Sequence, residues 1–116
     1  MTSPLPAPLR IAVQAIEDLK GTRVVVLDLR GLSDAADFFI IASGTSDAHV
    51  RGIADSVIEK LRLGGQHVHH IEGLTGGRWV LLDFVDFVVH LFHPEMRSFY
   101  QIERLWSDAP ALVAGA

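Results

Sequence analysis

Residues 78–92 decide the fold of this chain, and they read Arg-Trp-Val-Leu-Leu-Asp-Phe-Val-Asp-Phe-Val-Val-His-Leu-Phe. Two β-rich apolar runs separated only by a short turn are typical of a β-hairpin. If Phe84 and Val85 form the turn, Asp83 lies opposite Asp86 and the two strands pair outward from there. The sequence therefore predicts an antiparallel hairpin whose register is set by this turn.

Side chains alternate between the two faces of a strand, so the predicted register also assigns each residue to a face. One face carries apolar side chains and a single charged one: Val80, Leu82, Phe87, Val89, Leu91 and Arg78. The other face brings together an aromatic ring, aliphatic side chains, carboxylates and a histidine: Trp79, Leu81, Asp83, Asp86, Val88 and His90. The first face is typical of a core, and the second is where function should be sought.

Helical and strand-like patterns alternate on both sides of the hairpin. Helices are predicted over residues 9–20, 46–63 and 98–106. Strands are predicted over residues 23–29, 37–43, 66–71 and the two arms of the hairpin, with the His-rich segment at a sheet edge. The order α-β-β-α-β-β-β-α predicts an α/β sandwich with a mixed five-stranded sheet and packed helices. The helix between the second and third strands fits a right-handed crossover between parallel strands.

Length and composition indicate one globular domain, because the chain has 116 residues, 49% of them apolar and 21% charged. We expect this domain at residues 9–109, between flexible tails at residues 1–8 and 110–116. Ten Lys and Arg against fourteen Asp and Glu give a net charge of −4, without a basic cluster. This charge disfavours direct nucleic-acid binding and favours a basic protein partner.

The absence of cysteine excludes disulfides and thiolate chemistry. The first residues do not resemble a signal peptide, and no apolar run is long enough for a membrane span. A cytoplasmic location is therefore the expected default.

Asp83 and Asp86 admit three interpretations. They could hold a metal for transfer chemistry, or simply end two strands at a turn. They could also bind a basic partner, which would relieve a mutual repulsion of roughly 0.2–1 kcal/mol. No nucleophile, Lys or Arg clamp or phosphate-binding glycine loop accompanies them. The sequence therefore predicts no catalytic residues, no metal and no cofactor.

Other polar residues carry weaker signals. His67 and His69 share a strand face and could chelate a metal, but without a third ligand a solvated edge strand is favoured. The segment Gly44-Thr45-Ser46 opens a helix, yet it lacks a Walker lysine, so a plain N-cap is favoured over an anion site. His90 fits a buried structural histidine as well as an interface residue. Trp79 is a residue type that anchors protein interfaces, although it could also belong to the core.

Several segments in unbroken order carry a resemblance to one family. They are Asp28-Leu-Arg-Gly-Leu-Ser33, Asp37-Phe-Phe-Ile-Ile-Ala-Ser-Gly-Thr-Ser46, His70-Ile-Glu-Gly73, Trp79-Val-Leu-Leu-Asp83, Asp86-Phe-Val-Val-His90, Arg97-Ser-Phe-Tyr-Gln-Ile-Glu-Arg-Leu-Trp106 and Asp108-Ala109. Over residues 9–109 the chain resembles the ribosomal silencing factor (RsfS) family, also called the Iojap-like proteins. One departure is Val85, where many members have glycine, so the sequence does not demand a left-handed residue in this turn and leaves its type open.

The resemblance implies a non-enzymatic translation repressor. Such proteins bind the large ribosomal subunit through its fourteenth large-subunit protein, block joining to the small subunit, and lower translation when nutrients are scarce. Organelle relatives act in large-subunit assembly, which is the alternative role; a nucleotide- or metal-dependent transferase is a more distant alternative. The family fold is a mixed α/β sandwich shaped like nucleotidyltransferases, and members tend to form homodimers off the ribosome.

The predicted partner contact combines the face assignment with this resemblance. It comprises Trp79, Leu81, Asp83, Asp86, Val88 and His90. An acidic protein would reach a basic ribosomal protein through an apolar patch flanked by carboxylates.

Overall fold

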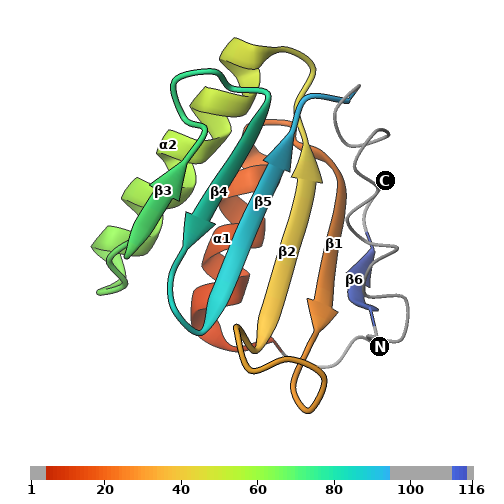
Figure 1. The fold of residues 1–116 in the computed structure, drawn as a ribbon. Helices are drawn as coiled ribbons and strands as arrows, with labels where there is room; N and C mark the ends of the chain where they lie inside the picture. The colour runs from red at the N-terminus through yellow and green to blue at the C-terminus, as the bar shows by residue number, and fades with distance from the viewer. Residues whose placement is uncertain (1–4, 95–110, 115–116) are drawn as a thin grey trace.

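The computed structural model describes residues 5–94 and 111–114. These residues form a mixed β-sheet with helices on one face (Figure 1). The elements are α1 (Ala7–Asp18), β1 (Thr22–Asp28), β2 (Phe38–Ser43), α2 (Asp47–Leu63), β3 (His70–Glu72), β4 (Trp79–Asp83), β5 (Phe87–Phe92) and β6 (Ala111–Ala114). The sheet has six strands in the order β3-β4-β5-β2-β1-β6. Among these strands, β2 and β5 run parallel, and the other neighbouring pairs are antiparallel.

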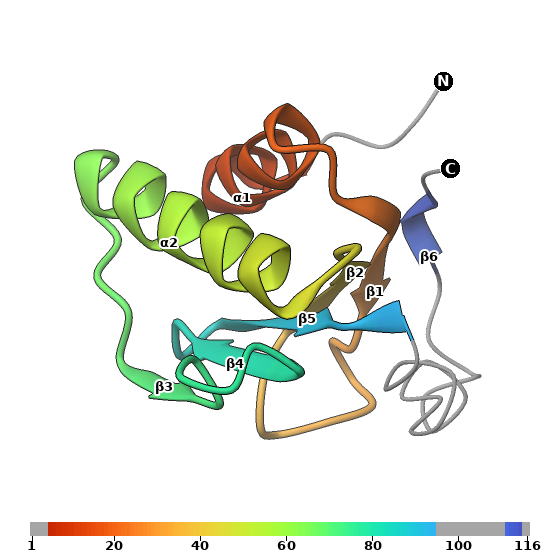
Figure 2. The same ribbon diagram turned by 90° about the horizontal axis from the view of Figure 1, so that it is seen from above.

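The two helices lie side by side on one face of the sheet, as Figure 2 shows from above. Their apolar stripes meet the helix-side residues of the strands in one core cluster. The stripe of α2 consists of Val50, Ile53, Ala54, Val57 and Leu61, all buried. The sheet contributes alternate residues, among them Ile40, Val80, Leu82 and Val89, which are fully buried. The opposite sheet face is not covered by α1 or α2, and we call it the open face.

The local sequence explains where α2 begins and where α1 ends. Ser46 accepts a hydrogen bond from the backbone N–H of His49 at 3.0 Å, so the predicted N-cap of α2 is confirmed. At the end of α1, Lys20 adopts the left-handed conformation with φ 65°, and the Gly21 N–H donates to the Ile16 carbonyl at 2.9 Å. This is the hydrogen-bond pattern of a Schellman motif. Gly21 therefore follows the left-handed residue, and an added Cβ would collide with the Ile16 side chain.

The predicted mixed α/β fold is confirmed, with differences at the sheet edges. All five predicted strands are present, and a further strand, β6, pairs with β1 within the segment that we expected to be a tail. β3 is an edge strand as predicted, but it spans only His70–Glu72. β3 points in the same direction as β2 (Figure 1), but the two strands are not neighbours, because β4 and β5 lie between them. The predicted helix over residues 98–106 lies outside the described residues.

The predicted register of the hairpin is wrong by two residues. The pairing joins Trp79 with Phe92, Leu81 with His90, and Asp83 with Val88. The loop consists of Val85 and Asp86, and the Phe84 N–H donates to the Phe87 carbonyl at 2.9 Å. The core explains the shift, because the rings of Phe84 and Phe87 stack with centroids 5.0 Å apart and both are buried. Keeping both rings inside moves the turn one residue along the chain.

The turn requires a positive φ at Val85, which the sequence did not predict. Val85 has φ 76°, a conformation that is rare for a β-branched residue. A positive φ at the first loop position is the type II′ pattern, which normally takes glycine there. The expectation that Val85 removes this demand is therefore wrong.

Candidate partner-binding surface

The open face carries all but one of the residues predicted from the sequence. Their neighbours in sequence on β4 and β5 are buried in the core on the helix side, so alternation places the predicted residues opposite. The residues on the open face are Trp79, Leu81, Asp83, Val88 and His90. A shift of two residues keeps side-chain parity, which is why this assignment remained correct despite the wrong register. Asp86 lies in the loop.

Trp79 and His90 contact each other on this surface. The indole Nε1–H of Trp79 donates to Nδ1 of His90 at 3.2 Å, and the indole ring stacks on Phe92 with centroids 5.1 Å apart. Trp79 is half-buried, so one side of the ring is fixed and part of it stays accessible. The ring is thus held in one orientation before any partner arrives, which lowers the entropy lost on binding.

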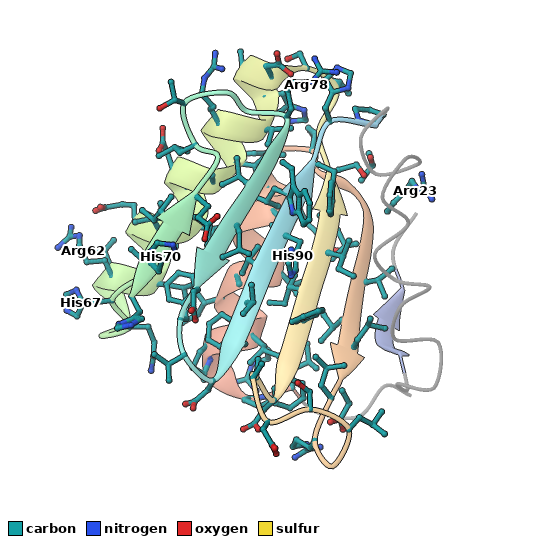
Figure 3. All side chains as sticks on the ribbon, in the orientation of Figure 1. Arg23, Arg62, His67, His70, Arg78 and His90 are labelled. Carbon is teal, nitrogen blue, oxygen red and sulfur yellow. The ribbon has the colours of Figure 1, made fainter. Side chains whose placement is uncertain are left out.

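His90 is only 4% exposed and lies in the middle of the sheet, as Figure 3 shows. Phe39 packs edge-on against it with ring centroids 4.6 Å apart. Burial lowers the pKa of His90 to about 4, so its ring is neutral at neutral pH. Because Nδ1 accepts from Trp79, the ring proton belongs on Nε2, which has no hydrogen-bond partner among the described residues. His90 would therefore act on a partner through Trp79 and not by direct contact.

The two carboxylates do not face each other, contrary to the sequence prediction. Asp83 pairs with Val88, and its Oδ1 accepts the Val85 N–H at 2.7 Å. This bond is local turn chemistry, one of the alternatives left open for Asp83. Asp86 is exposed at the loop, where its carbonyl accepts the Asp37 N–H at 2.8 Å. The acids therefore lie in different places, and the paired-carboxylate arrangement for metal chemistry is absent from this hairpin.

Glu72 is a residue of this surface that sequence reasoning missed. The strand predicted from the sequence ends at residue 71, but β3 pairs Glu72 with Leu81 and so places it on the open face. His70, two residues earlier, lies on the same face and its Nε2 is 2.9 Å from Oε2 of Glu72. The alternation of His70 and Glu72 around Ile71 was the available signal. Together, Glu72 and Asp83 give the β3–β4 side of the open face its negative charge.

The remaining polar candidates have local explanations. Within residues 5–94, no three His, Asp or Glu side chains gather as a metal site, and His67 and His69 are exposed near the sheet edge. Gly44 is required for packing, because an added Cβ would lie 2.8 Å from a methyl of Val50. The glycine before the α2 N-terminus thus has a structural role.

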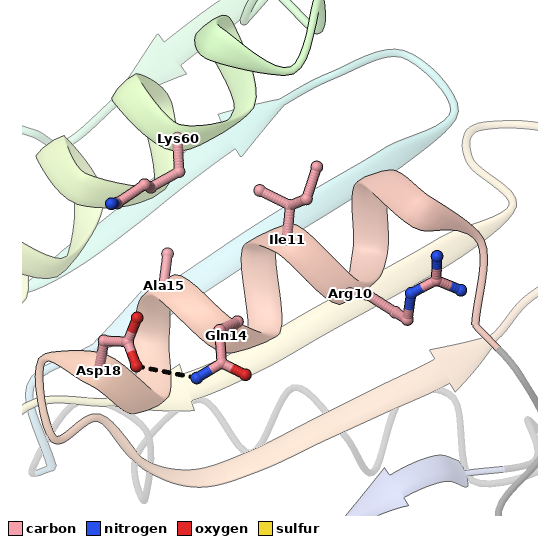
Figure 4. A pocket seen from close by; sticks show the side chains of 6 residues that line it. All are labelled: Arg10, Ile11, Gln14, Ala15, Asp18 and Lys60. Carbon is pink, nitrogen blue, oxygen red and sulfur yellow. Dashed lines mark hydrogen bonds between the residues drawn. The ribbon is translucent and has the colours of Figure 1, made fainter.

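A cavity of about 420 Å³ lies on the other side of the molecule, between α1 and α2 (Figure 4). It is lined by Arg10, Ile11, Gln14, Ala15, Asp18 and Lys60. Gln14 and Asp18 hydrogen-bond each other at 2.8 Å, and Arg10 donates to the Leu5 carbonyl at 2.7 Å. Its polar groups do not converge on one point, so it offers less to a ligand than the open face does.

The sequence matches a known protein family over nearly its whole length. The family described as "Ribosomal silencing factor during starvation" matches residues 2–115. The chain belongs to this family. It is 41% identical over 104 residues to ribosomal silencing factor RsfS of Halalkalibacterium halodurans, covering 90% of this chain and 89% of that protein. It is 42% identical over 102 residues to the protein of the same name from Bacillus subtilis, covering 88% and 86%.

The chain is also similar to a solved structure and to an organelle protein. A crystal structure of a Chromobacterium violaceum protein superposes with a TM-score of 0.86 at 36% identity, covering 90% of this chain and 88% of that one. A mouse protein named "Mitochondrial assembly of ribosomal large subunit protein 1" is 34% identical over 74 residues, covering 61% of this chain and 32% of that protein. In the described part of the chain, neither helix is long and apolar enough to cross a membrane.

Proposed function

We propose that this protein is a ribosome-associated translation repressor that binds the large ribosomal subunit through its open face and blocks joining to the small subunit. The observation that carries the proposal is the composition of that face. Trp79, Leu81 and Val88 are half-buried apolar residues in one strip, and Glu72 and Asp83 flank it. An apolar centre with a charged rim is the anatomy of a protein-binding surface.

The charge of the chain indicates the kind of partner. A protein with net charge −4 and acids beside its apolar strip is attracted to a basic surface and repelled by bare phosphate. A basic ribosomal protein is therefore a better contact than ribosomal RNA. The family resemblance names the fourteenth large-subunit protein, and the family name supports a silencing role.

The decisive experiment is sedimentation of purified ribosomal subunits through a sucrose gradient with and without the protein. We expect the protein to migrate with the large subunit and the fraction of joined ribosomes to fall. Unchanged joining at saturating protein would reject the proposed repression. The variant Glu17→Lys, on the exposed side of α1, should act like the wild type.

A substitution of Trp79 tests the surface itself. Trp79→Ala should weaken large-subunit binding by at least ~2 kcal/mol, because a central aromatic anchor contributes about that much. Circular dichroism must show that the variant is folded, since Trp79 also stacks on Phe92. A folded variant with wild-type affinity would place the interface on another face.

Large-subunit assembly is the second candidate, and the name of the mouse relative favours it. The two roles predict different effects of gene deletion. Loss of an assembly factor leaves incomplete large subunits during growth, whereas loss of a repressor leaves them complete and raises translation under starvation. Gradient profiles and subunit composition in both conditions distinguish them.

A transferase activity has little support in the described residues. The helix N-terminus at Ser46 has no adjacent lysine clamp, and the two hairpin acids lie apart. Calorimetry with nucleoside triphosphates and Mg²⁺ should therefore show no binding. Micromolar affinity that disappears in the double variant Asp83→Ala, Asp86→Ala would revive the enzyme hypothesis.

A further inference from the structure

A small pocket opens on the open face where β3 meets β4. Its volume is about 200 Å³, and it is lined by Glu72, Gly73, Trp79 and Leu81. The pairing of Glu72 with Leu81 places these side chains next to each other. Trp79 precedes Leu81 by two residues in β4 and therefore lies on the same face. The backbone therefore builds the pocket from three side chains that converge.

Gly73 keeps this pocket open. Its φ is 77°, and an added Cβ would collide with the carbonyl oxygen of Trp79. Only glycine lets the chain turn here while lying against the β4 backbone. The wall at Gly73 is thus bare backbone, which leaves room for a side chain from outside.

The chemistry of the walls selects the occupant. Trp79 and Leu81 are apolar, and a carboxylate, that of Glu72, stands at the rim with its side chain 66% exposed. An aliphatic chain ending in a cation satisfies both, because its stem contacts the apolar walls while the charged end meets the indole face and the carboxylate. A neutral apolar side chain would add no partner for the carboxylate beyond His70, whose Nε2 is 2.9 Å from Oε2, and an anionic one would be repelled.

The size of the pocket indicates a single side chain. Pockets for small-molecule ligands usually span about 300–1,000 Å³, and this one is smaller. Its shape is also set in advance, since Trp79 is held by His90 and Phe92. A preformed pocket beside an apolar strip is where a partner inserts an anchor residue.

We propose that this pocket receives a lysine or arginine side chain from the basic protein partner, with its stem between Trp79 and Leu81 and its charge on Glu72. The proposal rests on the proposed function, because the cation comes from the ribosomal protein that the open face binds. It assigns a binding role to Glu72 and names the chemistry that the partner must supply at this point.

The experiment compares Glu72→Gln and Glu72→Lys with the wild type in binding to purified large ribosomal subunits. Glu72→Gln should weaken binding about 3- to 10-fold and flatten its dependence on salt, and Glu72→Lys should weaken it more. Glu17→Gln, a matched change on an exposed helix position, should have no effect. If the wild type binds and Glu72→Gln binds equally well at low salt, the pocket proposal is overturned and the proposed function stands.

A second arm keeps the proposal testable if the wild type does not bind the subunit. Nuclear magnetic resonance follows the Trp79 indole N–H and the Gly73 amide during titration with N-acetyl-arginine methylamide, N-acetyl-lysine methylamide and the uncharged norleucine analogue. A cationic probe should shift both signals in the wild type and not in Glu72→Gln, and the larger shift identifies arginine or lysine. Shifts without subunit binding would reject the proposed function and support the pocket. If the wild type does not bind the subunit and neither cation shifts the two signals, the pocket proposal is overturned.

Discussion

At the scale of single residues, Val85 adopts a positive φ, which is a costly backbone conformation for a β-branched residue. Its φ of 76° brings a branched Cβ against the backbone, which costs roughly 1–2 kcal/mol that glycine does not pay. A glycine at this position would remove that cost, but part of the gain in stability would be offset because glycine loses more entropy on folding. Val85→Gly should therefore raise the free energy of unfolding by about 1 kcal/mol, measured by urea denaturation.

A control separates backbone strain from loss of side-chain contacts. Val85 is 59% exposed, so its side chain contributes little packing. Val85→Ala keeps a Cβ and should gain less than Val85→Gly. If glycine destabilises the protein, the strain at this position is smaller than its φ implies.

His90 makes stability depend on pH. Its pKa is about 4 in the folded protein, because burial disfavours the charged ring, against 6.5 in the unfolded chain. Between these values the unfolded state binds more protons, so acid favours unfolding. The free energy of unfolding should therefore fall as the pH decreases from 6.5 toward 4, by up to about 3 kcal/mol.

His90→Gln removes the titrating group and isolates this contribution. Asp28 and Glu59, whose pKa values are lowered by hydrogen bonds from Arg30 and Arg62, titrate in both proteins and cancel in the comparison. Urea denaturation from pH 4 to 7 should show a shallower pH dependence in the variant. Equal slopes would mean that His90 is not buried in its neutral form.

At the scale of elements, the hairpin shows what the sequence could and could not predict. Alternation along residues 78–92 was enough to separate core residues from the open face, because parity survives a shift of two. The register was not predictable from turn residues alone, since Val85 is a poor signal for a positive φ. It is decided by the burial of Phe84 against Phe87, a contact that only the folded core supplies.

The short strands β3 and β6 show a second limit of sequence reasoning. β3 is exposed along its whole length, so it lacks the apolar alternation that identifies a half-buried strand. Among the described strands, β6 pairs with β1 alone, and the small residues of its segment resemble a tail. Because Glu72 belongs to β3, missing the extent of that strand also meant missing this part of the surface.

The observed hairpin separates Asp86 from the other residues of the predicted contact. It is exposed at the loop, away from the apolar strip, so its charge should attract a basic partner without being buried on binding. Asp86→Lys should slow association with the large subunit about 3- to 10-fold and leave dissociation nearly unchanged. Stopped-flow measurements at two salt concentrations provide the test, with Glu17→Lys as the matched charge change. Normal association of Asp86→Lys would exclude this loop from the approach of the partner.

At the scale of the whole molecule, α1 and α2 cover one face of the sheet and leave the strip of Trp79, Leu81 and Val88 half-buried on the other. The layered α/β architecture was predictable because element order and apolar periodicity survive local errors. The function of the open face was not, since the same alternation describes a face that binds a partner and one that the chain itself covers. Family membership favours the first interpretation.

The last prediction concerns self-association of the free protein. An apolar strip tends to be covered, and a two-fold symmetric dimer through the open face would cover it with a second copy. Such a dimer brings Glu72 and Asp83 of both copies together, and each copy has a net charge of −4. Screening of this repulsion should strengthen the dimer as salt rises.

Binding to a basic ribosomal partner should respond to salt in the opposite direction, because screening weakens attraction between unlike charges. Light scattering at increasing salt should therefore show more dimer, while sedimentation under the same conditions shows less protein on the large subunit. Leu81→Asp places an acid within the strip, between Glu72 and Asp83, and should reduce both contacts, whereas Glu17→Lys should reduce neither. A strict monomer at high concentration, or a dimer that Leu81→Asp leaves intact, would separate self-association from the open face.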